Sequence, residues 1–290
     1  MKIIENTKRE TFNERANKSL SFLYKTYLGS LFLKVLIKPS ISKLCGSFLN
    51  TKLSSKMIKP FVKKNNINLE DFEKRNFNSY NDFFTRKIAS GKRNIALDKN
   101  AFISPCDSKL SVYTIDSNSS FKIKNSDYTI SDLLDGNEIY KDYINGQCLI
   151  FRLCVDDYHR YCYIDNGTKS NNTFIQGKLH TVQPIALEKY NIYKRNSREY
   201  TILHTENFDD VIQIEVGALI VGKIANLHEE HAFKKGEEKG MFEFGGSTIV
   251  LLVKENTVNI DEEILQNTKN GLETIVKYGE RIGTKYEAIN

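Results

Sequence analysis

The amino-acid sequence predicts an α+β fold, in which a helical N-terminal region is followed by a β-rich domain. In the first part, apolar side chains recur at three- and four-residue spacing, which is typical of amphipathic helices. From about Ala101, short runs rich in β-branched and aromatic residues alternate with turn signals such as Asn145–Gly146 and Lys235–Gly236. This change divides the chain into a helical region, residues 1–97, and a β-rich domain, residues 98–290.

The helical region contains two predicted segments. Lys18–Asn50 has the pattern of one or two amphipathic helices broken near Pro39, and lysines interrupt its apolar content. Such a helix can lie in the plane of a membrane interface or pack on its own domain, and the pattern alone leaves both open. Asn68–Phe72 resembles a capped helix start, and a second helix is predicted to run from it toward Tyr80–Arg86.

The β-rich domain is predicted to hold strands interrupted by helical stretches. Four runs have the composition of strands: Ser111–Thr114, Cys148–Leu153, Val211–Val216 and Thr248–Val253. A short helix is expected at Thr129–Leu134. Helical patterning returns near Ile260–Lys277, so a further helix is expected there.

Composition and charge exclude several classes of protein. The 290 residues allow one large or two modest domains, and 40% hydrophobic residues are enough for a globular core. The net charge of +6 is too small for a dedicated nucleic-acid binder, but it favours an anionic surface such as an acidic bilayer. Five cysteines without a CxxC pair fit a reducing cytosol better than a disulfide scaffold. No segment has the ~18 apolar residues of a membrane span or the apolar core of a signal peptide.

The residues before the last predicted strand are the first candidates for chemistry. Gly245–Thr248, with the sequence GGST, reads most simply as a turn that enters the strand. Because glycine admits backbone conformations that other residues avoid, Ser247 Oγ could instead approach and attack the Gly246 carbonyl. The resulting N-to-O acyl shift gives an ester. Elimination of that ester leaves dehydroalanine, which hydrolyses to a pyruvoyl group.

Two further motifs are candidates for catalysis. Val155–Tyr161 places His159 among acidic residues and an arginine at a strand end, where active sites gather, although a histidine beside aromatic residues is often structural. Imidazole titrates near neutral pH and therefore suits proton transfer. Ile103–Ser108 carries Asp107 in a turn after a strand, which is also ordinary turn chemistry.

Metal and nucleotide sites are not predicted. His228 and His231 form a pair at positions i and i+3, but the sequence gives them no supporting ligand set, so no metal is expected. The chain also lacks the glycine-rich phosphate loop of nucleotide-binding proteins and the GxGxxG motif of dinucleotide-binding folds.

Taken in this order, the motifs resemble those of the phosphatidylserine decarboxylase family. The resemblance covers roughly Tyr80 to Arg281, and five ordered pieces are together far more specific than any one of them. The pieces are Phe83–Arg86, like the family's FFxR segment; Ser104–Asp107, like its SPxD turn; Asp157–Arg160, like its DYHR motif; Gly177–Pro184, like its GxLxxVxP stretch; and Lys235–Thr248, like its KGxExGxFxxGGST sequence.

The resemblance implies a self-cleaving enzyme. The precursor would cut itself between Gly246 and Ser247 into a β chain, residues 1–246, and an α chain, residues 247–290. Ser247 would become an N-terminal pyruvoyl group. Its carbonyl would act as the electron sink for decarboxylation of phosphatidylserine to phosphatidylethanolamine and CO2, without an external cofactor.

The charge-relay residues of the family fall on Asp107, His159 and Ser247 of this chain, and two nearby positions depart from the family pattern. Many members have a glycine where this chain has Ser108, and a second histidine where it has Cys162. If those members divide self-cleavage and decarboxylation between two histidines, His159 has to serve both here. Cys162 is expected to be a buried structural cysteine, with a contribution from its thiol as the alternative.

A lipid substrate also gives Lys18–Asn50 a purpose, because an enzyme anchored at the bilayer surface reaches the headgroup without extracting the acyl chains. Residues 1–97 are therefore expected to associate with the membrane, and the protein to be peripheral, at the cytoplasmic face of the cell membrane. The expected partners are phosphatidylserine, the membrane surface and the two chains of the precursor, with no nucleic acid and with a homo-oligomer left open. Arg160, Arg198 and Lys178 are candidates for the phosphate from charge and location alone.

Two other interpretations stay open at this point. A pyruvoyl decarboxylase that acts on a soluble amino acid would explain Gly246–Ser247 but not the basic, aromatic N-terminal region. A non-enzymatic β-rich carrier or binding module would explain the strands and would treat Gly245–Thr248 as a turn.

Overall fold

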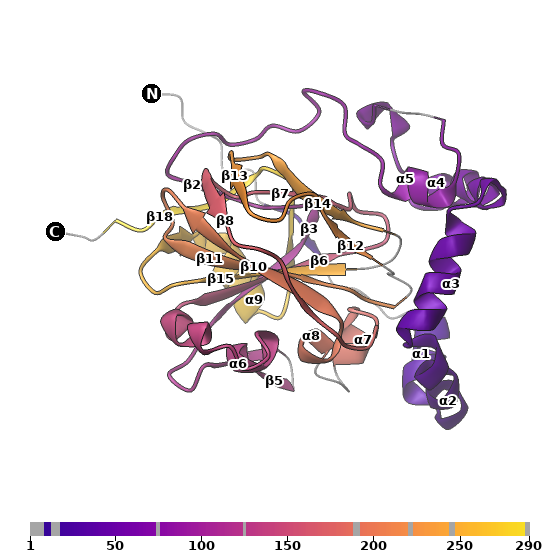
Figure 1. Cartoon of the computed structure of the whole chain (residues 1–290), viewed down its shortest axis with the longest axis horizontal. Helices are drawn as coiled ribbons and strands as arrows, with labels where there is room; N and C mark the ends of the chain where they lie inside the picture. The colour runs from indigo at the N-terminus through magenta and orange to yellow at the C-terminus, as the bar shows by residue number, and fades with distance from the viewer. Residues whose placement is uncertain are drawn as a thin grey trace.

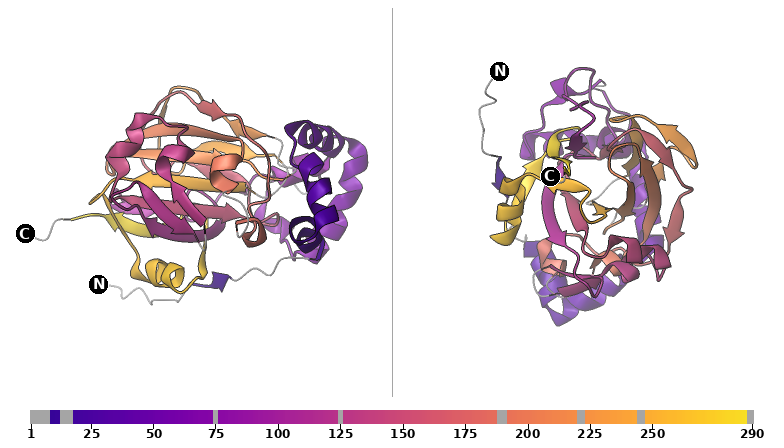
Figure 2. Two further views of the ribbon diagram at one scale, coloured as in Figure 1. Left: turned by 90° about the horizontal axis from the view of Figure 1, so that it is seen from below. Right: turned by 90° about the vertical axis from the view of Figure 1, so that its left-hand side faces the viewer.

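A computed structural model of the chain describes residues 9–12, 18–73, 76–123, 126–187, 192–219, 223–243 and 247–287. Its strands form one large antiparallel sheet and three smaller ones, and α1 to α5 lie together at one side of the molecule (Figures 1 and 2). A helical N-terminal region followed by a β-rich remainder confirms the predicted α+β class.

The large sheet has ten strands and forms the centre of the molecule. Its order is β1-β17-β3-β6-β15-β11-β10-β8-β13, with β9 also paired to β10. Its members are β1 (Thr11–Phe12), β3 (Ser108–Thr114), β6 (Gln147–Leu153), β8 (Gly167–Lys169), β9 (Thr173–Ile175), β10 (Arg198–Thr205), β11 (Asp210–Val216), β13 (His231–Phe233), β15 (Ser247–Val253) and β17 (Glu273–Val276). The four strands predicted from the sequence are present as parts of β3, β6, β11 and β15.

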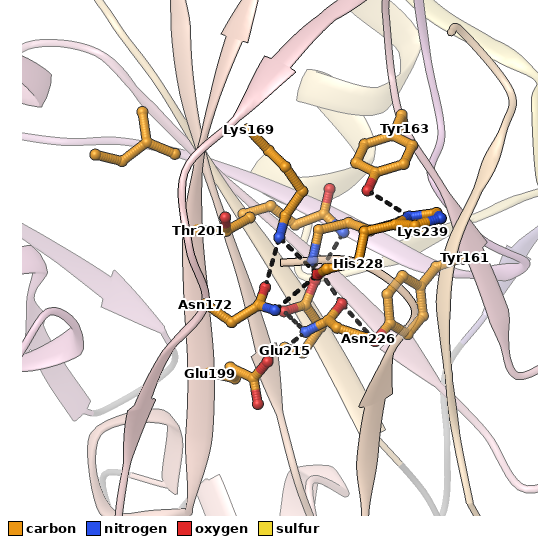
Figure 3. A network of polar contacts seen from close by, with 12 residues as sticks. Tyr161, Tyr163, Lys169, Asn172, Glu199, Thr201, Glu215, Asn226, His228 and Lys239 are labelled. Atoms are coloured by element: carbon orange, nitrogen blue, oxygen red, sulfur yellow. Dashed lines mark hydrogen bonds and ion pairs between the residues drawn. The ribbon is translucent and has the colours of Figure 1, made fainter. Parts of the chain in front are cut away.

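Three smaller sheets complete the β structure. Their strands are β7 (Arg160–Cys162), β14 (Glu238–Phe242) and β12 (Ile224–Asn226); β2 (Ala101–Ile103), β18 (Arg281–Lys285) and β16 (Val258–Ile260); and β4 (Ser120–Ile123) with β5 (Ser126–Thr129). The β7–β14–β12 sheet covers one face of the large sheet, since Lys239 and Asn226 reach Glu215 on β11 (Figure 3).

The N-terminal region is divided more finely than its sequence pattern predicts. Its elements are α1 (Lys18–Lys25), α2 (Tyr27–Leu36), α3 (Pro39–Leu49), η1 (Lys52–Met57, a 3-10 helix), α4 (Ile58–Lys64), η2 (Leu69–Asp71, also 3-10) and α5 (Tyr80–Phe84). Lys18–Asn50 therefore holds three helices rather than one or two. The additional break occurs because Thr26 Oγ1 accepts a hydrogen bond from Gly29 N at 3.0 Å and caps a new helix.

The prediction of one helix running from Asn68–Phe72 toward Tyr80–Arg86 is wrong. Asn68 does cap a helical turn, but η2 is only three residues long, and Phe72 then forms a bridge to Ile88. The short helix α5 starts independently, from a cap in which Ser79 Oγ accepts a hydrogen bond from Asp82 N. Two separate local caps thus give a sequence pattern that looks like the start and body of one helix.

The remaining helices are short and flank the sheets. They are α6 (Ile130–Leu133), η3 (Glu138–Tyr143), α7 (Pro184–Leu187), α8 (Ile192–Arg195) and α9 (Glu262–Lys269). The helix expected at Thr129–Leu134 corresponds to α6. The one expected at Ile260–Lys277 is correct only in its first half. Gly271, with φ of 73°, takes up the left-handed conformation after α9, and the chain returns as β17 beside β3.

The hydrophobic core joins the two parts of the chain. Tyr24, Leu33 and Ile37 from the N-terminal helices belong to the same buried cluster as β15, all seven residues of which are buried. β1 also pairs with β17, so residues from both sides of the predicted 97/98 boundary share the large sheet. The domain boundary itself stays a prediction.

A buried network of polar side chains lies between the large sheet and the β7–β14–β12 sheet (Figure 3). Lys239 and Glu215 are both fully buried and form an ion pair at 2.7 Å. Lys239 also donates to Asn226 Oδ1 at 2.7 Å, and Gln213 Nε2 donates to Glu215 at 2.9 Å. Because each charge is paired and hydrogen-bonded, the network can be held away from water between the two layers.

We expect the Lys239→Met variant, made in a Ser247→Ala background to prevent the implied cleavage, to lose about 3–5 kcal/mol of unfolding free energy. Methionine keeps the apolar stem but leaves the Glu215 carboxylate buried without its counter-ion. Urea unfolding measures the loss. Lys194→Met breaks the more exposed pair with Asp132 and should cost less than about 1 kcal/mol. Equal losses in the two variants would contradict this account of the network.

Candidate active site

Ser247 is the first residue of β15 and is completely buried. It lies opposite Leu153 on β6 in the antiparallel register, and its Oγ has no hydrogen-bond partner among the described residues. Buried hydroxyl groups usually find a partner. Because the hydroxyls of Ser42, Ser108 and Thr248 also have none among the described residues, Ser247 is distinguished by its position at the predicted cleavage site. Gly246 and the rest of the predicted cleavage site, residues 244–246, lie outside the described residues.

His159 is fully buried in the connection between β6 and β7. Its Nδ1 lies 2.9 Å from the carbonyl oxygen of Asp157, and its ring packs on Phe84 of α5 with centroids 4.0 Å apart. Since a carbonyl oxygen only accepts hydrogen bonds, Nδ1 must carry a proton. In the neutral imidazole, Nε2 is then the basic nitrogen.

The structure ties the segment that ends at His159 to the segment that ends at Ser247. At one end, Leu153 and Ser247 are partners in the β6–β15 register. At the other, Phe242 N donates to the carbonyl oxygen of His159 at 2.9 Å. These two contacts link described residues near both predicted side chains; that His159 and Ser247 form one site stays a prediction.

A charge-relay role for Asp107 predicts a hydrogen bond to His159, but the carboxylate of Asp107 has other partners. Its carboxylate is buried and accepts hydrogen bonds from Arg93 Nη2 at 2.7 Å and from Tyr278 N at 2.8 Å, with Lys277 Nζ 3.7 Å away. Among the described residues, no hydrogen bond joins it to His159. The guanidinium of Arg93 offers this carboxylate a charge-assisted pair that an imidazole does not match.

A second buried carboxylate, which the sequence analysis did not single out, holds the His159 loop in place. Asp157 forms an ion pair with Lys109 of β3 at 2.6 Å, and its other contact is a hydrogen bond from Cys154 N at 2.7 Å. Burial raises the pKa of Asp157, and Lys109 opposes that rise. The side chain of Asp157 thus fixes the turn whose carbonyl orients His159. The sequence signals for this pair are the position of Asp157 at the head of the DYHR-like motif and a lysine two residues after Asp107.

Cys162 is fully buried, as expected, and its environment favours the neutral thiol. Burial raises its pKa to about 12. Cys162 N donates to Pro105 O at 2.9 Å, which ties β7 to the turn that carries Asp107. These contacts favour a structural role for the residue over proton transfer.

Of the three candidates for the phosphate, two are already engaged. Arg198 is buried and donates to backbone carbonyl groups, including that of Leu133 at 2.7 Å. Arg160 pairs with Glu238 at 2.5 Å and donates to the Thr85 carbonyl. Lys178 is exposed. The engagement of Arg198 with the backbone argues against a phosphate role for it.

Comparison with known proteins identifies the class of the chain. The model of the family described as phosphatidylserine decarboxylase matches residues 80–284. Phosphatidylserine decarboxylase proenzyme 2 of Clostridium acetobutylicum is 51% identical over 278 residues, 95% of each chain. A phosphatidylserine decarboxylase proenzyme of Clostridium botulinum is 42% identical over 274 residues, which are 92% of this chain and 93% of the relative.

The chain is therefore an enzyme, and its class is that of the decarboxylases. Within that class it belongs to the phosphatidylserine decarboxylase family. The matched residues 80–284 agree with the span over which the five motifs predicted the resemblance, which is thereby confirmed.

We expect Asp157→Asn to slow self-cleavage by up to about 100-fold, because a catalytic group displaced by 1 Å can lose that much rate. Cleavage is followed on denaturing gels after cell-free synthesis. The double variant Lys109→Met/Asp157→Asn removes both charges and should cleave faster than the single variant. Asp165→Asn, which alters a buried pair with Lys235 at 3.5 Å, is the matched control and should cleave normally. Equal slowing in that control would reduce the Asp157 effect to general destabilisation.

Proposed function

We propose that the protein converts phosphatidylserine to phosphatidylethanolamine and CO2 after cutting itself between Gly246 and Ser247. The observation that carries the proposal is the buried Ser247 Oγ, which has no hydrogen-bond partner among the described residues at the start of β15. The names of the relatives support the substrate, because they are phosphatidylserine decarboxylase proenzymes. Because these relatives are named proenzymes, they also support cleavage of a precursor chain.

The cleavage chemistry follows from the serine hydroxyl. Ser247 Oγ forms a bond to the carbonyl carbon of Gly246, and the peptide C–N bond breaks, so that the nitrogen of Ser247 takes up a proton. Loss of the α-proton of residue 247 then expels the 1–246 chain as a carboxylate and leaves dehydroalanine. Water converts its enamine to a carbonyl and releases ammonia, which leaves the pyruvoyl group on residues 247–290.

His159 is the proposed base for this step. Its protonated Nδ1, held by the Asp157 carbonyl, leaves Nε2 to take the proton of the serine hydroxyl. Asp107 is proposed to stabilise the charge that develops on the imidazole. Since Arg93 and Tyr278 N already bind its carboxylate, we propose that it acts through the field of the buried site in the precursor rather than through a hydrogen bond.

The residues present also fit a pyruvoyl group at position 247. The side chain there is buried and makes no polar contact with described residues that conversion would have to break. When present, the group supplies an electron sink for loss of CO2. His159 would hold the proton that replaces the departing carboxylate on the substrate's α-carbon, and burial of the site keeps water from that carbon.

The Ser247→Ala variant should remain a single 33.4 kDa chain and lack decarboxylase activity, because alanine has no hydroxyl to attack the Gly246 carbonyl. Intact mass spectrometry and a denaturing gel measure cleavage, and CO2 release from phosphatidylserine vesicles measures activity. His159→Ala should also stay whole, whereas His204→Ala, which alters an exposed histidine, should be cut normally. Full activity of the uncut Ser247→Ala variant would refute the proposal.

The N-terminal helices provide the proposed membrane contact. Of the fifteen large apolar side chains exposed in the described part of the chain, ten lie between residues 22 and 57. We call these ten the N-terminal surface: Phe22, Tyr27, Leu28, Leu31, Phe32, Val35, Leu44, Phe48, Leu53 and Met57. Six exposed lysines lie in the same part of the chain, at positions 25, 34, 38, 43, 52 and 56.

This combination suits insertion of apolar side chains among lipids while lysines bind anionic headgroups. None of the described helices is both long and apolar enough to cross a bilayer. We therefore propose that residues 1–97 hold the enzyme peripherally, at the cytoplasmic face of the cell membrane, where phosphatidylserine is reached in place. Nothing in this role requires a homo-oligomer.

The N-terminal surface is linked to His159 through a small core. Leu49 of α3, Ile58 of α4 and Phe83 and Phe84 of α5 are buried together, and Phe84 also packs on the His159 ring. The helices that would touch lipid are thus built onto the same packing that positions the catalytic base. This continuity supports a lipid substrate over a soluble amino acid.

We expect the double variant Leu28→Ser/Phe32→Ser to bind vesicles of phosphatidylcholine and phosphatidylserine at least about tenfold more weakly, since a fully buried apolar side chain contributes roughly 1.5–3 kcal/mol. Co-sedimentation measures binding, and the gel assay should show unchanged self-cleavage. Leu97→Ser/Phe174→Ser, at similarly exposed positions elsewhere, is the matched control. Equal binding by the two double variants would place the lipid contact elsewhere, and faster turnover of free serine than of vesicles would favour a soluble substrate.

A further inference from the structure

Two histidines that the proposed reaction does not use lie beside a carboxylate. One ligand atom from each of His228, His231 and Glu237 lies within 4.8 Å of the other two. The two imidazole rings stack with centroids 3.7 Å apart, and His231 Nε2 is 2.8 Å from Glu237 Oε1. All three side chains are half-buried, so solvent can reach them.

The sequence offered only the two histidines, and the structure brings in the third group. β13 begins at His231, and the chain then reverses through a turn at Gly236, whose φ of 81° suits glycine. This reversal places Glu237 against His231, where Glu237 Oε2 also accepts a hydrogen bond from Lys234 N at 3.0 Å. The turn therefore fixes the carboxylate next to the histidine pair.

A further contact orients His228. Its Nδ1 lies 3.2 Å from the hydroxyl of Tyr163, as the dashed line in Figure 3 marks. The Tyr163 ring is itself stacked on Phe233, with centroids 4.1 Å apart, and is buried. Histidines that bind metals usually make such a hydrogen bond from the other ring nitrogen, which sets the tautomer and leaves Nε2 for the metal.

Lys169 fixes the backbone at the same place. Its Nζ donates to the carbonyl oxygens of His228 at 2.9 Å and Glu229 at 2.6 Å, and it also donates to Asn172 (Figure 3). A lysine bound to these carbonyl groups holds the backbone in front of His231.

From this arrangement we propose that His228, His231 and Glu237 bind a divalent transition metal ion, with Zn²⁺ as the best match. Two imidazoles and one carboxylate are a known zinc ligand set, with a fourth position filled by water. Bonds of about 2.0–2.2 Å in a tetrahedral site put ligand atoms about 3.4 Å apart. His231 Nε2 and Glu237 Oε1, which are 2.8 Å apart, must therefore separate slightly, and the two stacked imidazole rings must turn so that both face one ion. Half-exposed side chains can do this by rotation about their own bonds.

The site would have a structural role in this chain. Glu237 directly precedes β14, and Glu237 O accepts a hydrogen bond from Tyr163 N at 2.9 Å. A bound ion would join the start of β14 to the 228–231 segment. Because Ser247 and His159 lie beyond the other end of β14, the ion would not take part in the reaction. The proposal is independent of the proposed function.

The test uses the full-length chain with any affinity tag removed, because a histidine tag binds the same ions. Equilibrium dialysis against Zn²⁺ should give one bound ion per wild-type chain, and Co²⁺ should give the visible spectrum of a tetrahedral site with nitrogen and oxygen ligands. His228→Ala, His231→Ala and Glu237→Gln should each lower the affinity by at least about 100-fold, and Tyr163→Phe by about 10–100-fold. Zn²⁺ should raise the melting temperature of the wild type but not of the ligand variants.

His204→Ala is the matched control, because His204 is an exposed histidine whose Nδ1 also lies against a carboxylate, that of Asp210 at 2.6 Å. This variant should bind the ion as the wild type does. Melting curves without metal check that each variant is folded. The proposal is overturned if the folded wild-type chain binds no Zn²⁺ in the micromolar range, or if the folded His228→Ala and His231→Ala variants bind it as tightly as the wild type.

Discussion

The pairing of β15 with β6 is the constraint on which the rest of the site depends. It carries Ser247 into the interior as the first residue of a fully buried strand, and it sets the starting point of the loop that ends at His159. At the end of that loop, His159 O accepts a hydrogen bond from the backbone N of Phe242, the last residue of β14. Ser247 and His159, the proposed nucleophile and base, are thus positioned mainly by backbone hydrogen bonds, which side-chain substitutions disturb little.

Buried ion pairs lie around this unit and balance its charges. Asp157 is neutralised by Lys109, and Asp107 by Arg93. Lys239 and Glu215 pair under the same small sheet that contains β7 and β14. A low-dielectric interior strengthens each of these interactions, and it also penalises any charge left alone. Each of these charges is therefore matched by an opposite charge.

The sequence predicted the fold class, the four main strands and the family, because each depends on local composition or on motifs in a fixed order. The extent of the N-terminal helices could not be predicted, since the Thr26 and Ser79 caps interrupt patterns that look continuous. The partners of Asp107 and the role of Asp157 were missed for a different reason. Adjacent positions in a motif say nothing about which of two carboxylates faces an arginine, a lysine or a histidine once the chain is folded.

Because β15 lies in the middle of the large sheet, a cut before Ser247 would leave two chains that share this sheet. The fragment 247–290 would contribute β15 between β6 and β11, and β17 between β1 and β3. β18 would stay paired to β2. The two products would therefore be interleaved strand by strand, and separating them would require unfolding the shared core. Reassembly of the two chains from unfolded pieces would have to re-form the central sheet, because each chain supplies strands that lie between strands of the other.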